Sequence, residues 1–95
     1  MAIQSFRDQR AKAILDGATP GKGFPSDLLR VAKRKLEMLE AAVALNDLRM
    51  PPGNRLEALS GDRKGQHSIR VNDQFRLVFI WTEAGPAEVE FVDYH

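Results

Sequence analysis

The sequence predicts an α+β fold in which two N-terminal helices pack on one face of a small antiparallel β-sheet. The first half of the chain repeats apolar residues at spacings of three and four, the period of an amphipathic helix. After residues 50–53, Met-Pro-Pro-Gly, polar and apolar residues instead alternate with a period of two, as in strands with one buried face. The 95 residues are therefore expected to form one domain, 1–95, with helices first and strands second.

The N-terminal segment predicts a short edge strand and a first helix. Residues 2–4 are apolar enough for the strand, and Ser5 begins a pattern typical of a helix cap. The helix is expected from Phe6 to about Asp16. Gly17 is suited to ending it, and the proline and glycines at 19–23 predict a loop.

A second, longer helix is predicted from Pro25-Ser26 to about Leu45. Its expected buried stripe consists of Leu29, Ala32, Leu36, Leu39 and Val43. The basic run 33–35 reads either as a solvated helix face or as a contact with a partner or RNA, and both interpretations stay open.

The second half predicts a meander of strands. A single turn is expected at 46–48, a strand at 54–59 and a loop at 60–65. A hairpin of strands 68–71 and 75–81 follows, and after a turn at 82–86 the last strand runs from 87 to 94.

The apolar alternation also predicts the register of the hairpin. If Ile69 and Val71 share a face with Phe75, Val71 must lie opposite Phe75, because a slip of one residue turns every side chain to the other face. Arg70 then lies directly across from Arg76 on the outward face. Since like charges in that position destabilise a sheet, an anionic partner is expected there.

Composition bounds the function. Cysteine is absent, and no run approaches the roughly 18 apolar residues of a membrane span, so a cytoplasmic protein without membrane contact is expected. The net charge is only +1. Residues 1–50 carry nine basic and six acidic residues, a balance of +3, whereas residues 77–95 carry four acidic residues and no Lys or Arg. A basic surface is therefore possible on a nearly neutral protein.

No familiar catalytic or metal-binding motif is present. The two histidines, His67 and His95, are too few for a metal site without cysteine, so no metal or cofactor is expected. What remains suits RNA, because arginine and lysine bind phosphate while Tyr94 and His95 can stack on a base or move protons. The candidate phosphate ligands are Arg55, Arg63, Lys64, Arg70 and Arg76.

RNA can be cleaved without a metal, because its own 2′-hydroxyl attacks the adjacent phosphate. The protein then supplies a base, an acid and a cation, and the fork of Arg76 matches phosphoryl oxygens better than a lysine would. From the pattern alone Arg76 could also be a surface strand residue and His95 a frayed end. His67 falls on the apolar side of its strand and is interpreted as a residue at the edge of the core, with a place in the functional site as the alternative.

Residues 51–79 together with VDYH at 92–95 resemble the HigB-type toxins of bacterial toxin-antitoxin modules, the plasmid maintenance system killer group within the RelE/ParE superfamily. The resemblance extends to IQSF at 3–6 and to the helix at 25–42. It implies a RelE-like fold and a ribosome-dependent mRNA endoribonuclease acting in the ribosomal A site. It also implies a helix-turn-helix antitoxin of the HigA kind, through which any contact with operator DNA would be indirect.

The resemblance assigns the family's functional positions to Arg76 and to the terminal Asp93, Tyr94 and His95. Two positions depart from some members of the family: Ser60 replaces a basic residue and Glu57 a histidine. The carboxylate at 57 could be a general base or a surface residue.

In the mechanism that this implies, Arg70, Arg63 and Lys64 bind the RNA and a base stacks on Tyr94. His95 would move a proton, and Arg76 would stabilise the pentavalent phosphate. Two other functions stay open. A ParE-like toxin would inhibit DNA gyrase without any nuclease site, and a degenerate toxin would only bind its antitoxin.

Overall fold

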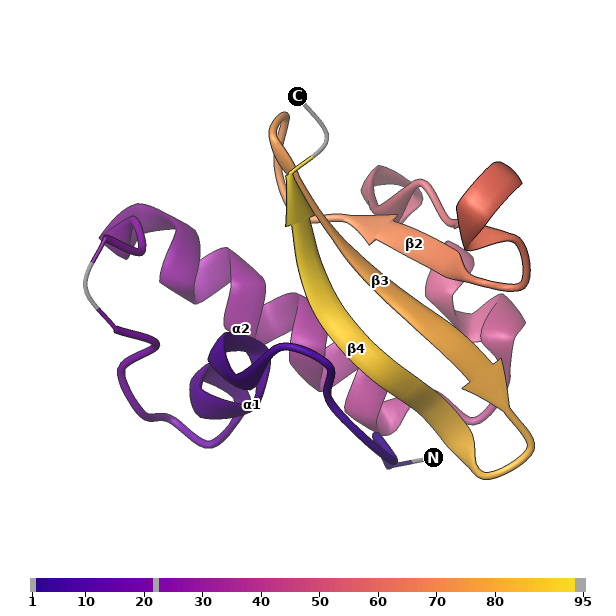
Figure 1. Ribbon diagram of the computed structural model, residues 1–95, viewed down its shortest axis with the longest axis horizontal. Coiled ribbons are helices and arrows are strands. Elements are labelled where there is room, and N and C mark those ends of the chain that lie inside the picture. The colour runs from indigo at the N-terminus through magenta and orange to yellow at the C-terminus, as the bar shows by residue number, and fades with distance from the viewer. Residues whose placement is uncertain (1, 22, 94–95) are drawn as a thin grey trace.

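Over the residues that the structure describes, the chain folds as two α-helices packed on a four-stranded antiparallel sheet, which confirms the predicted class. A computed structural model describes residues 2–21 and 23–93. Its sheet has the order β1-β2-β3-β4, so neighbours in sequence are neighbours in space. Figure 1 shows α2 behind the sheet and α1 beside β4. The elements are α1 Gln9–Leu15, α2 Ser26–Ala41, β1 Glu57–Ala58, β2 His67–Arg70, β3 Phe75–Thr82 and β4 Gly85–Asp93, with short 3₁₀ turns η1 Leu45–Arg49, η2 Pro52–Asn54 and η3 Gly61–Arg63.

The core lies between the helices and the inward face of the sheet. Alternate strand residues face inward, as the period of two requires. The strand contribution is Ile69, Val71, Leu77, Phe79, Val89 and Phe91, and the helix contribution includes Ala11, Ile14, Leu28, Ala32, Leu36 and Leu39. In the described part of the chain, no helix has the length and apolar content needed to cross a membrane.

The predicted hairpin register is confirmed. Ile69 pairs with Leu77 and Arg70 pairs with Arg76. The Val71 amide donates to the Phe75 carbonyl over 3.0 Å, which leaves residues 72–74 as the loop. The two arginines therefore share the outward face.

The N-terminal segment differs from its prediction. Residues 2–4 form no strand, and α1 begins at Gln9, where Asp8 rather than Ser5 is the cap. Ser5 instead binds β4, because its hydroxyl accepts a hydrogen bond from the Glu88 amide at 2.9 Å. This hydrogen bond lies at an irregularity in the β3–β4 pairing, where Glu88 adopts a left-handed backbone conformation with φ 52°.

Helix α2 ends four residues earlier than predicted. Asp47 explains this, because its carboxylate accepts hydrogen bonds from the amides of Val43 and Ala44, each over 3.0 Å, and so removes them from the helical ladder. Val43 is 69% exposed and does not belong to the buried stripe. Lys35, predicted on the basic run 33–35, is instead buried.

The strand predicted at 54–59 is reduced to Glu57–Ala58. Asn54 is fully buried, and its amide nitrogen donates to the carbonyls of Leu48 and Met50, which bends the chain away from the sheet. At the other end of the sheet, β4 begins at Gly85 rather than at Ala87, so the preceding turn is tighter than expected.

Asp8 provides a test of this architecture, since its carboxylate accepts from the Arg10 amide at 2.9 Å and from the Phe91 amide at 3.2 Å. Burial raises the pKa of this carboxyl, but the bonds from Arg10 and Phe91 outweigh burial and hold it below the ordinary 3.8. Asp8→Ala should lower the free energy of unfolding by about 1–2 kcal/mol at neutral pH. The difference in the free energy of unfolding between variant and wild type should shrink as the pH falls below about 3.8. A carboxyl whose pKa is lowered by folding stabilises the folded state only while it is ionised.

Asp16→Ala is the matched control for Asp8→Ala. Asp16 lies at the other end of α1, and its carboxylate forms an exposed ion pair with Lys12. Its loss should cost no more than about 0.5 kcal/mol. Urea unfolding of both variants measures the contrast, and equal losses would show that Asp8 does not fasten α1 to β4.

Candidate functional site

Arg76 is the centre of the site, on the outward face of β3. Its Nη2 donates to Glu57 Oε1 at 3.0 Å, and its Nη1 donates to Ser68 Oγ at 3.0 Å and to the Arg55 carbonyl at 3.4 Å. The side chain is only 13% exposed. Three neighbours from separate segments therefore hold the guanidinium in one orientation.

A polar hollow of about 290 Å³ opens beside Arg76. Its lining is Arg55, Arg70, Asn72, Asp73 and Arg76, three cations and one acid. Guanidinium groups gathered in a concave site match the charge and shape of a phosphate. The hollow can therefore bind an anion of that class.

The two opposed arginines each have a carboxylate partner. Glu57 pairs with Arg76, and Asp73 at the tip of the hairpin pairs with Arg70. The anionic partner that the register predicts is thus supplied within the chain. Asp73 is 97% exposed and Glu57 is 52% exposed, so solvent weakens both pairs.

Two of the other predicted phosphate ligands lie outside this hollow. Arg63 reaches the outward side of β4, where its Nη1 lies 3.4 Å from Glu90 Oε2. Lys64 is exposed just after η3. Of the basic residues predicted to bind RNA, the structure brings together Arg55, Arg70 and Arg76 and leaves Arg63 and Lys64 at a separate position.

The terminal trio is described only in part. Asp93 ends β4 opposite Phe75, and its Oδ2 accepts a hydrogen bond from Gln74 Nε2 at 3.0 Å. Figure 1 shows the end of β4 beside the β2–β3 hairpin. The predicted site residues Tyr94 and His95 lie outside the described residues.

His67 lies on the opposite side of β2 from the arginine hollow. Its ring stacks on Phe79 with 6.3 Å between centroids, which confirms that it is at the edge of the core. Its buried Nδ1 has no hydrogen-bond partner among the described residues. His67 therefore belongs to the inward face and does not join Arg76.

Sequence reasoning missed Ser68, the hydroxyl partner of Arg76. Ser68 is fully buried although it faces outward. The signal was present, because the register that pairs Arg70 with Arg76 places Ser68 on the same face, diagonally opposite. The contribution of the Arg55 carbonyl had no such signal, since it depends on the path of the loop before β1.

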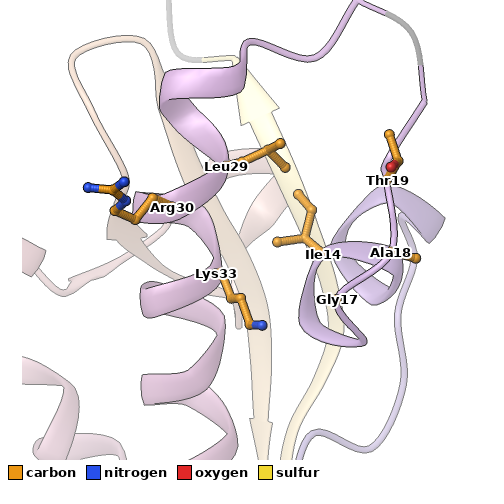
Figure 2. Close-up of a pocket in the computed structure, with 7 residues that line it drawn as sticks. All are labelled: Ile14, Gly17, Ala18, Thr19, Leu29, Arg30 and Lys33. Atoms are coloured by element: carbon orange, nitrogen blue, oxygen red, sulfur yellow. The ribbon is translucent and has the colours of Figure 1, made fainter.

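A second hollow, of about 270 Å³, lies between the end of α1 and the side of α2. Figure 2 shows Ile14 and Leu29 facing each other across it, with Arg30 and Lys33 on α2. None of the predicted site residues lines it. Among residues 2–21 and 23–93, no cluster of three or more His, Asp or Glu side chains is placed to hold a metal ion.

Comparison with known proteins identifies the relatives of this chain. Residues 4–95 match the family model described as "RelE-like toxin of type II toxin-antitoxin system HigB". The chain is 43% identical to Toxin HigB-1 of Vibrio cholerae over 95 residues, all of this chain and 98% of that protein. It is also 40% identical over 76 residues to an uncharacterized protein of Haemophilus influenzae, across 80% of this chain and 75% of that one. The chain belongs to the HigB-like family of RelE-like toxins from type II toxin-antitoxin systems.

Proposed function

We propose that this toxin is an endoribonuclease that cuts mRNA in the ribosomal A site and thereby stops translation. The observation that carries the proposal is the guanidinium of Arg76, held by three neighbours beside an arginine-lined hollow. A cation fixed in this way stabilises charge that develops in a transition state without reorganising during the reaction. The ribosome places the site of action in the cytoplasm.

The reaction is an internal phosphoryl transfer. The 2′-oxygen of the RNA attacks the adjacent phosphorus and the bond from phosphorus to the 5′-oxygen breaks, leaving a 2′,3′-cyclic phosphate and a 5′-hydroxyl. Arg76 stabilises the pentavalent phosphate, while Arg55 and Arg70 bind neighbouring phosphates. No metal is required, because the nucleophile belongs to the substrate.

Proton transfer is assigned to the end of the chain. His95 exchanges protons with the 2′- and 5′-oxygens, as a histidine does most readily near neutral pH, and Tyr94 stacks on a base. Asp93 ends β4 and precedes Tyr94 and His95 in the sequence. Glu57 pairs with Arg76 in the free toxin, and its carboxylate is the alternative general base.

Membership of a toxin-antitoxin family implies an antitoxin as the partner of this chain. We assign it to the helix-turn-helix HigA type, which would bring operator DNA to the complex without direct contact from the toxin. Arg63 and Lys64, which lie outside the arginine-lined hollow, would bind RNA phosphates at a separate position.

The test of the function is expression of the toxin without its antitoxin. Translation should stop, and sequencing of RNA ends should map new 5′-hydroxyl termini within translated codons. In a purified system, mRNA on ribosomes should be cut much faster than naked mRNA, because few groups on the toxin can orient RNA unaided. Intact mRNA accompanied by gyrase-linked DNA breaks would contradict the proposal and favour gyrase inhibition.

Arg76→Ala should lower cleavage of ribosome-bound mRNA by at least about 10²-fold, the usual loss when one transition-state donor is removed. Thermal stability should fall rather than rise, because Glu57 already offsets the repulsion from Arg70. Arg30→Ala, an exposed change on α2, is the matched control and should cut at the wild-type rate. Wild-type cleavage by a folded Arg76→Ala protein would remove Arg76 from the site.

His95→Gln should lower the cleavage rate by about 10²- to 10⁴-fold, the range that general acid-base catalysis contributes. Binding of the antitoxin and the melting temperature should stay at wild-type values. Measuring both shows whether the loss of cleavage comes from the chemical step or from a change in the fold. Deletion of His95 should give the same result. If both variants cut normally while Glu57→Gln does not, proton transfer belongs to the carboxylate at 57.

A further inference from the structure

A lysine and an asparagine are buried together beneath the loop that leads into β1. Lys35, on α2, is 9% exposed and Asn54, at the end of η2, is 0% exposed. Lys35 Nζ donates a hydrogen bond to Asn54 Oδ1. Burying an amine is costly unless it is paired, so this contact does more than fill space.

The other end of the asparagine holds the loop. Asn54 Nδ2 donates to the Leu48 carbonyl at 3.1 Å and to the Met50 carbonyl at 3.4 Å. The side chain thus satisfies backbone groups that have no strand partner in this stretch. Through it, α2 determines where the loop lies.

The next residue in the chain connects this pair to the arginine hollow. Arg55 has a left-handed backbone with φ 46°, which is unfavourable for a residue other than glycine and must be held by its surroundings. Its carbonyl accepts the hydrogen bond from Arg76 Nη1. Because Asn54 and Arg55 are adjacent, a shift of the buried asparagine moves that carbonyl.

We propose that Lys35 and Asn54 are positioning residues for Arg76, which hold the Arg55 carbonyl so that the guanidinium keeps the orientation needed to meet a phosphate. The inference rests on the proposed function of Arg76 and gives α2 a role in the site. The charge of Lys35 also interacts with a residue of the hollow: burial lowers the pKa of its amine, and the charges of Arg34 and Arg70 lower it further. A test must therefore separate its hydrogen bond from its charge.

Lys35→Met and Lys35→Gln make that separation. Both remove the charge, and the two new side chains have the same length, but only glutamine can donate to Asn54 Oδ1. In the ribosome-bound mRNA assay, Lys35→Met should lower kcat by about 10- to 100-fold with KM nearly unchanged, the effect expected of a small misplacement of a catalytic group. Lys35→Gln should recover most of that loss.

A readout without RNA accompanies the kinetics. In NMR spectra of the 95-residue toxin, Lys35→Met should shift the Arg76 Nε–Hε resonance and the Arg55 amide, and Lys35→Gln should leave both near their wild-type positions. A purely structural pair would lower the melting temperature while kcat per folded molecule and both resonances stayed unchanged. That result overturns the proposal.

Asn54→Asp is the second test, for use if Lys35→Met does not fold. It keeps an acceptor for Lys35 but loses the donors to the Leu48 and Met50 carbonyls, so the NMR resonance of the Arg55 amide should shift and kcat should fall. Unchanged values overturn the proposal.

The experiments distinguish failure of the proposed function from failure of the positioning role. If wild-type toxin cuts no mRNA, the function is wrong and the resonances alone decide the positioning. If Arg76→Ala stops cleavage while Lys35→Met cuts fully, the positioning alone is wrong.

Discussion

The structure depends on the register of β2 against β3, and the register depends on burying one face of the hairpin. Ile69 and Leu77 are paired and fully buried against the helices. A slip of one residue would expose such side chains at about 1.5–3 kcal/mol each. The repulsion between Arg70 and Arg76 costs about 0.2–1 kcal/mol by comparison. The cost of exposing the apolar side chains therefore determines the register. The two opposed arginines on the outward face are a consequence of it.

Both edges of the sheet are fastened by polar side chains that bind backbone. Along β4, Ser5 and Asp8 accept hydrogen bonds from the amides of Glu88 and Phe91. Near β1, Asn54 donates to two loop carbonyls while accepting from Lys35. Each of these contacts keeps its segment out of a regular helix or strand. This explains why α1 begins later than predicted and why β1 is only two residues long. Elements at the edges are thus set by particular hydrogen bonds rather than by periodicity.

This difference separates what the sequence could predict from what it could not. Alternation over 68–81 was enough to predict the hairpin, its register and the shared face of Arg70 and Arg76. The stripe predicted from Leu29 missed the burial of Lys35. The signal was present, because Lys35 lies three residues after Ala32 and four before Leu39, both of them buried. The bond between Arg76 and the Arg55 carbonyl had no such signal, since it spans 21 positions and depends on the loop that Asn54 bends.

The three hydrogen-bond partners described above for Arg76 differ in charge and in exposure to solvent. This difference affects how a substrate phosphate could reach the guanidinium. Ser68 Oγ and the Arg55 carbonyl are neutral and belong to packed segments, so they can orient the guanidinium throughout a reaction. Glu57 is half exposed, and an ion pair of that kind contributes about 0–1 kcal/mol. A phosphate that binds a guanidinium through two hydrogen bonds can displace such a carboxylate. In the proposed nuclease, the neutral partners would thus fix the geometry, while Glu57 would offset the repulsion from Arg70 until an RNA phosphate takes its place.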